Sequence, residues 1–226
     1  MESVADGVYR LGSRWLNWYV VDDRGALTVV DTGYPAYFAE LEPGLASIGR
    51  RITDMRAIVL THAHADHLGC VARIHDASGA RVFAHMADAD VVQQGHAKPP
   101  PGFFLEAWRP RFARYLAHAA RSGGRSIDGV PRVETFGDGV VLDVPGNLRV
   151  LHTPGHTPGH CAFVLERDGV LFSGDALVTL DTATGRKGPR LIRWNDDGEQ
   201  ATASYERLRA QHAPLVLPGH GEPWRR

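Results

Sequence analysis

The densest group of chemically competent side chains lies at residues 61–67, Thr-His-Ala-His-Ala-Asp-His. His62 and His64 follow a short apolar segment expected to be a strand, and side chains two apart on an extended backbone share a face. They can therefore hold one metal ion together. Asp66 and His67 fall on the turn into the next helix and point elsewhere, toward a possible second ion. A solvated histidine-rich turn is the alternative, but a histidine tag sits at a chain end, so the spacing favours a metal site.

A second histidine-rich segment, His-Thr-Pro-Gly-His-Thr-Pro-Gly-His, covers residues 152–160. Its prolines and glycines restrict the loop to few shapes, which lowers the entropy lost when a metal ion binds. The spacing does not say which histidine binds, and a merely stiff loop is the alternative.

Two glycine-containing segments follow expected strands. Asp175, in Ser173-Gly174-Asp175, offers the two oxygens needed to bridge dications about 3.5–4 Å apart, although an aspartate after glycine usually forms a turn. His220, in Pro218-Gly219-His220-Gly221, becomes a candidate ligand only as part of the set.

The elements that must position these segments follow from hydrophobic periodicity and turn residues. The sequence predicts helices over 37–48, 68–75, 86–94 and 200–210. It predicts strands over 8–11, 15–21, 26–30, 57–60, 81–84, 132–136, 140–144, 148–151, 161–165, 170–173 and 215–217. Strands followed by helices in each half predict two similar α/β halves.

Residues 95–130 differ from the rest and are expected to form a helical insert. After the stiff segment 98–102, one helical stripe is predicted, with Pro110 as a kink; it comprises Phe104, Leu105, Trp108, Phe112, Tyr115, Leu116 and Ala119. The stripe could cap the metal cleft and bind an apolar acyl group, with Arg109, Arg111 and Arg114 available for an anionic group. Packing on the core and an oligomer interface are the alternatives.

The composition is that of an ordinary soluble globular chain. Of 226 residues, 43% are hydrophobic, and 25 Lys and Arg balance 26 Asp and Glu for a net charge of −1. No overall basic surface indicates nucleic acid or an anionic membrane, and no apolar run approaches the roughly 18 residues of a membrane span. The two cysteines, Cys70 and Cys161, cannot build a disulfide framework and are expected to pack as small apolar groups. Without a signal-peptide pattern, we expect a cytoplasmic protein; an oligomer is neither indicated nor excluded.

Taken in order, five segments resemble the motifs of the metallo-β-lactamase superfamily of metal hydrolases. They are Asp31-Thr32-Gly33, His62–His67, Thr153–His160, Gly174-Asp175 and Gly219-His220-Gly221, which span most of the chain. The resemblance implies an α/β fold, the αββα sandwich of two face-to-face sheets with flanking helices. It implies one domain over residues 1–226, with the insert at about 95–130 and the site where strand ends of both halves converge.

The resemblance also implies a glyoxalase II-like ligand set. His62, His64 and His156 would bind one metal ion, and Asp66, His67 and His220 would bind the second, with Asp175 as the bridge. It selects His156 over His152 and His160. For His85, His152 and His160, a structural role is the preferred interpretation. Asp31 is either a support that orients the histidine loop or a simple turn residue.

Two zinc ions, with iron or manganese as other possible metals, would lower the pKa of a shared water from about 15.7 to about 7. The resulting hydroxide, oriented by Asp66, would cleave an ester, thioester, lactone or amide of a small molecule. No side chain is marked as the acid for the leaving group.

The substrate is harder to infer because this chain departs from several subfamilies. The Gly-Cys-Gly-Lys segment of glyoxalase II-like thioesterases and the Gly-Cys-Gly-Arg segment of persulfide dioxygenases are both missing after Asp175. Val178 stands where acyl-homoserine lactonases place a tyrosine, and metallo-β-lactamases proper lack the bridging aspartate. A mononuclear iron oxygenase of the persulfide dioxygenase type and a non-catalytic metal-binding or sensor protein are the alternatives. The identity of the bound metal separates the iron oxygenase from the zinc hydrolase.

Overall fold

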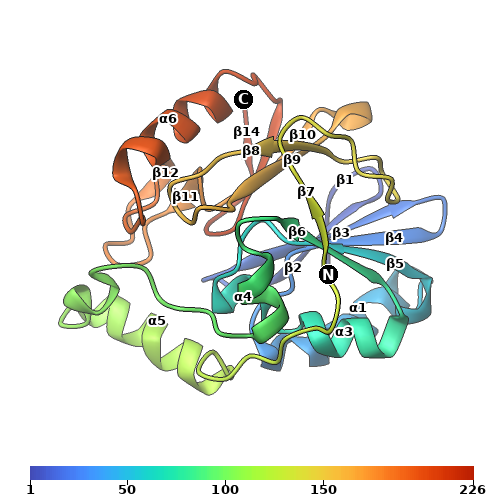
Figure 1. Cartoon of the computed structure of the whole chain (residues 1–226), viewed down its shortest axis with the longest axis horizontal. Coiled ribbons are helices and arrows are strands. Elements are labelled where there is room, and N and C mark those ends of the chain that lie inside the picture. The colour runs from blue at the N-terminus through green and yellow to red at the C-terminus, as the bar shows by residue number, and fades with distance from the viewer.

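Two β-sheets face each other in the computed structural model, which describes residues 1–226 (Figure 1). The first sheet has the strand order β1-β2-β3-β4-β5-β6-β7. Its strands are β1 (Glu2–Ala5), β2 (Val8–Gly12), β3 (Asn17–Asp23), β4 (Ala26–Val30), β5 (Met55–Val59), β6 (Arg81–His85) and β7 (Glu134–Phe136). Strands β1 to β4 pair antiparallel and β4 to β7 pair parallel, so β4, β5 and β6 end at the same edge.

The second sheet has the order β14-β13-β10-β9-β8, and a two-stranded ribbon joins β11 to β12. Its strands are β8 (Arg149–His152), β9 (Cys161–Leu165), β10 (Val170–Gly174), β13 (Leu215–Pro218) and β14 (Trp224–Arg225), and the ribbon is β11 (Val178–Leu180) with β12 (Lys187–Arg190). Because β10 and β13 are parallel, their carboxyl ends also meet at one edge.

Helices flank the two sheets. They are α1 (Phe38–Ser47), α2 (Ala65–Leu68), α3 (Val71–Ser78), α4 (Ala89–Gln94), α5 (Pro110–Arg121) and α6 (Gly198–Arg209), with short 3-10 turns at Pro35–Tyr37, Ile52–Asp54, Phe103–Glu106 and Glu166–Asp168. Figure 1 shows α1 and α3 against the first sheet and α6 across the second. The predicted αββα sandwich is therefore confirmed. No helix combines the length and apolarity needed to cross a bilayer.

Alternating side chains on each strand explain the layers. On β4, Val29 packs with the helices whereas Val30 packs between the sheets. Phe163 and Phe172 of the second sheet complete that middle layer, and Leu208 of α6 packs on the outer face of the second sheet. Both cysteines are free and fully buried, as expected.

Some predicted elements are wrong. Residues 140–144 are not a strand, because the chain turns at Gly146 and Asn147, both with positive φ, and only an isolated bridge joins Val141 to Arg149. The helix predicted over 68–75 is divided between α2 and α3, and the helix predicted from residue 86 begins only at Ala89. Strands β1, β11, β12 and β14 were not predicted, because they are short and depend on a partner strand for their hydrogen bonds.

The insert does not form one kinked helix. A 3-10 turn precedes Pro110, which starts α5 at a position where a helix needs no backbone N–H. The predicted stripe is consequently split, with Leu105 and Trp108 79% and 73% exposed but Phe112 and Tyr115 buried.

Candidate metal centre

The first histidine loop follows β5, and Asp31 at the end of β4 fixes its shape. Asp31 has a left-handed backbone (φ 59°), and its Oδ1 accepts the Thr61 backbone N–H at 2.8 Å. Its Oδ2 lies 2.8 Å from Nδ1 of His67, which sits on α2 beside Asp66. The Nδ1–H of His67 therefore donates to Asp31, and Nε2 on the other side of the ring remains without a hydrogen-bond partner. Of the two interpretations of Asp31, the structure favours the support that orients the histidine loop.

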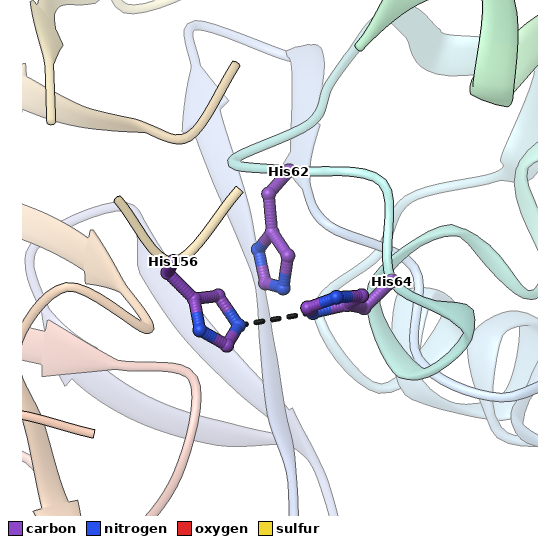
Figure 2. A group of neighbouring side chains, drawn as sticks. All are labelled: His62, His64 and His156. Carbon is purple, nitrogen blue, oxygen red and sulfur yellow. Dashed lines mark hydrogen bonds between the residues drawn. The ribbon is translucent and has the colours of Figure 1, made fainter. Parts of the chain in front are cut away.

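The second histidine loop brings one imidazole toward the first loop. Nδ1 of His156 donates to the Trp194 carbonyl at 2.8 Å. Its Nε2 lies 2.9 Å from Nδ1 of His64 and 3.4 Å from Oδ2 of Asp175. Figure 2 shows the rings of His62, His64 and His156 converging from the two loops.

The other histidines of this loop have structural contacts. Nε2 of His160 accepts the Asp175 backbone N–H at 2.9 Å, so His160 holds the backbone of the proposed bridging residue. His152 stacks on His85 with ring centroids 4.1 Å apart, and its Nε2 contacts the Pro158 carbonyl. These contacts agree with the structural role preferred for His85, His152 and His160.

His220 and Asp175 approach from the ends of β13 and β10. Nδ1 of His220 donates to the Trp15 carbonyl, and its Nε2 lies 3.2 Å from Oδ2 of Asp175 and 3.5 Å from Oδ2 of Asp66. A Cβ at Gly219 would overlap Oδ1 of Asp175, so only glycine permits this close approach.

All seven predicted residues therefore meet in one place, which we call the His/Asp centre. Ligand atoms within 4.8 Å of one another form three overlapping groups, which are His62 with His64 and His156, His62 with His67 and Asp175, and Asp66 with His67 and His220. His62 and His67 each belong to two groups, so the two expected sets of ligands are contiguous.

Unpaired buried atoms provide the test of whether this centre suits a metal ion. Nε2 of His62, Nε2 of His67 and Oδ1 of Asp175 are buried and have no hydrogen-bond partner. Leaving such a group unpaired costs about 1–3 kcal/mol, and buried polar groups are otherwise nearly always satisfied. Bound dications would use these lone pairs, and a nitrogen and oxygen donor set suits zinc, iron or manganese. The residues present fit such ions.

The protonation states also suit metal binding. Burial, reinforced by the neighbouring imidazoles, lowers the pKa of His62 well below its ordinary value, and burial and His156 lower that of His64 to about 3. Both rings therefore keep free lone pairs at neutral pH. Burial opposes the charged form of His67, but the carboxylates of Asp31, Asp175 and Asp66 outweigh it and raise the pKa of His67 to about 10. A dication would take the place of that proton, because metal ions and protons compete for one lone pair.

Asp88 is a functional residue that sequence reasoning missed. It is buried, its Oδ1 accepts the Gly159 backbone N–H at 2.8 Å, and its Oδ2 accepts the Thr157 hydroxyl at 2.7 Å and the Ala63 backbone N–H at 3.2 Å. It thus ties the two histidine loops together. Its only sequence signal was an aspartate near the start of an expected helix, where capping is the usual role, but its side chain makes no cap hydrogen bond to α4.

Tyr115 is a second missed residue. Its hydroxyl donates to Oδ2 of Asp66 at 2.9 Å and accepts from the Tyr34 hydroxyl at 3.1 Å. An aromatic residue in a helical stripe is typical of core packing, so the stripe did not signal this contact. The insert therefore holds one of the proposed ligands.

A cavity of about 450 Å³ opens on the His/Asp centre. Residues of the insert form much of its wall, so this part of the insert contributes to the cleft, as one of the alternatives predicted. The arginines expected to serve an anionic group do not line it. Arg109 pairs with Glu106, and Arg111 lies over the Trp15 ring.

Comparisons with known proteins identify relatives of this chain. Hydroxyacylglutathione hydrolase of Fuscovulum blasticum is 37% identical over 177 residues, which are 78% of this chain and 51% of that protein. The chain thus spans about half the length of that relative. The uncharacterized protein YobT of Bacillus subtilis is 26% identical over 218 residues, covering 92% of this chain and 83% of YobT.

A solved structure matches the fold, and a family model matches most of the chain. The crystal structure of a metallo-beta-lactamase family protein from Thermus thermophilus aligns with a TM-score of 0.69 and 29% identity, covering 98% of this chain and 75% of that one. The family model of the metallo-beta-lactamase superfamily matches residues 16–220, a span that contains every residue of the His/Asp centre. On this fold, this centre and this match, the chain belongs to the metallo-beta-lactamase superfamily.

Proposed function

We propose that this protein is a dinuclear metallo-hydrolase, with zinc as the first candidate metal, that cleaves an ester, thioester, lactone or amide of a small molecule. The two expected ligand triads would each hold one ion, and Asp175 would bridge them. The observation that supports this most strongly is the set of unpaired buried atoms on His62, His67 and Asp175, beside an open cavity.

A pair of bound dications would supply Lewis acidity and a nucleophile derived from water at neutral pH. The chain's own residues hold the ligands in place. Main-chain carbonyls of Trp194 and Trp15 orient His156 and His220, so that each ring keeps its Nε2 lone pair toward the centre. Asp31 does the same for His67.

Asp66 and Tyr115 form the part of the centre that meets the insert. Tyr115 donates to one carboxylate oxygen of Asp66 and so restricts how that side chain can rotate. Asp66 and Tyr115 both line the cavity, where the Asp66 carboxylate can orient an incoming water.

The similarity to a hydroxyacylglutathione hydrolase places thioesters in the first panel of substrates. Identity of 37% over about half of that relative's length supports the reaction class more than the substrate. We therefore propose a test across ester, thioester, lactone and amide bonds rather than one compound.

Metal content is the first experiment, measured by elemental analysis of protein purified without chelator or added metal. We expect about two zinc ions per chain and metal-dependent hydrolysis of at least one member of the panel. His156→Gln should lose metal and activity, whereas His152→Gln, in the same loop but outside the centre, should keep both. One iron per chain with no hydrolysis would overturn the proposal in favour of oxygen-dependent chemistry. A fully metal-loaded protein without hydrolytic activity would instead favour a binding or sensor role.

A further inference from the structure

The cavity that opens on the His/Asp centre also has an apolar wall. Phe103 and Leu116 of the insert and Trp194 of the second half line it. Phe103 contacts Trp194 with ring centroids 5.0 Å apart and Phe112 at the same separation, so the wall is fixed by aromatic packing. An apolar group of a substrate therefore has a preformed surface beside the reacting centre.

Two cations, Lys98 and Arg125, lie at the solvent-exposed part of this lining. Neither side chain makes an ion pair or hydrogen bond within the protein. The only acidic residues that line the cavity are Asp66 and Asp175, which belong to the His/Asp centre. Lys98 and Arg125 are thus available to a ligand, in contrast to Arg109, which Glu106 neutralises.

The net charge of the insert also favours an anionic ligand. Residues 95–130 contain six Lys or Arg (98, 109, 111, 114, 121, 125) and two acids (106, 128), a net charge of +4 in a chain of net charge −1. Like charges gathered at the mouth of a low-dielectric cleft concentrate ligands of the opposite sign. The cavity entrance therefore favours anions.

We infer that the substrate is an acyl compound with an apolar body and an anionic group, a carboxylate or a phosphate, remote from the bond that is cleaved. Lys98 and Arg125 bind the anion while the apolar body packs against the wall formed by Phe103, Leu116 and Trp194. The cavity volume of about 450 Å³ suits a compound of that size, within the roughly 300–1,000 Å³ of small-molecule sites. The inference rests on the proposed hydrolytic function and specifies its substrate class.

Binding of non-hydrolysable ketones tests the charge preference without catalysis. The probes are 2-octanone, 7-oxooctanoate and 6-oxoheptyl phosphate, which share a methyl ketone and differ in the remote group. By calorimetry with the metal-loaded protein, we expect one of the anionic ketones to bind about tenfold more tightly than 2-octanone, since each exposed ion pair contributes up to severalfold. The stronger of the two identifies carboxylate or phosphate. The preference should shrink as salt is raised.

Variants separate anion binding at the entrance from anion binding at the metal ions. Lys98→Ala combined with Arg125→Ala should remove the preference. Arg114→Ala, which removes an exposed cation of the same insert that does not line the cavity, should leave it unchanged. A preference that survives the double variant would overturn the inference, because the anion would then be held by the centre itself. Equal binding of all three ketones by the unmodified protein would overturn it as well.

Hydrolysis of matched esters distinguishes failure of this inference from failure of the proposed function. We expect kcat/KM for the mono-p-nitrophenyl ester of suberate to exceed that for p-nitrophenyl octanoate about tenfold. The double variant should lose that advantage mainly through KM, with octanoate hydrolysis within twofold of the unmodified protein. Hydrolysis of both esters at equal rates would overturn the substrate class and leave the hydrolase intact. Hydrolysis of neither ester, nor of any thioester, lactone or amide of the panel, together with a preserved ketone preference, would overturn the hydrolase and leave the anion site.

Discussion

Replacing Asp88 with asparagine should loosen the connection between the two histidine loops while preserving side-chain shape. Three donors point at the carboxylate, with the Gly159 N–H on Oδ1 and the Thr157 hydroxyl and Ala63 N–H on Oδ2. An amide keeps one acceptor oxygen and introduces an N–H₂ group that cannot accept. The Thr157 hydroxyl can rotate and accept instead, but a backbone N–H has no such freedom.

The expected loss of unfolding free energy follows from the number of hydrogen-bond donors that lose their partner. In either orientation, the asparagine leaves one buried backbone N–H unpaired, which costs about 1–3 kcal/mol of unfolding free energy. Asp88→Ala leaves both backbone N–H groups unpaired, so its loss should be about twice as large. Because Asp88 holds the loops that carry His62, His64 and His156, we also expect metal affinity to fall about 10–100-fold, the usual range for residues that orient ligands.

Urea denaturation and metal titration of the same preparations check this reasoning. The control is Asp90→Asn, two residues further along α4, where the carboxylate is exposed and makes no hydrogen bond. Asp90→Asn should stay within about 0.5 kcal/mol of the unmodified protein. If Asp88→Asn matched that control in unfolding free energy and bound metal within twofold of it, Asp88 would not be the connection that its contacts indicate.

Three further predictions concern the insert and the metal ions. Tyr115→Phe removes the hydrogen bond to Asp66, so metal affinity should fall about tenfold; unchanged titration of Co²⁺, followed by its visible spectrum, would contradict this role. Phe112→Ala should cost about 3–5 kcal/mol in urea denaturation because the ring is fully buried, whereas Trp108→Ala, at a ring 73% exposed, should cost less than about 1 kcal/mol. Equal losses of unfolding free energy in the two variants would contradict the division of the stripe into a buried part and an exposed part. Chelation should lower the thermal midpoint, since metal at about 100 times its Kd stabilises by about 2.7 kcal/mol, and calorimetry with and without chelator would show no shift if the centre bound none.

The segments that carry the His/Asp centre could be found from the sequence because each is a local pattern, while the resemblance to the superfamily selected His156 within its loop and assigned ligand roles to Asp175 and His220. Histidines two apart after an apolar strand, a loop stiffened by proline and glycine, and aspartate or histidine next to glycine at strand ends all depend on near neighbours in the chain. Asp88 and Tyr115 carry no such pattern, since their partners at Gly159 and Asp66 lie 71 and 49 residues away. From the sequence alone, an isolated aspartate is interpreted as a helix cap and an isolated tyrosine as a core residue. Their roles at the centre become visible only once the distant segments have packed together.

The strands and helices divide in the same way. The buried strands β4, β5, β9 and β10 were predictable because apolar residues cover both of their faces. The short strands β11 and β14 were not, because they exist through pairing with a partner rather than through their own residues.

Local chemistry thus determined the fold class, the ligand types and the backbone turns that present them, because these depend on the spacing of residues along one segment. Closure of the two halves decided the rest. It set the contacts through which the supporting residues hold the centre, whether a stripe of the insert is buried or exposed, and which cations remain unpaired at the cavity. Those properties depend on contacts between segments far apart in the chain, whose geometry exists only once both sheets have packed together.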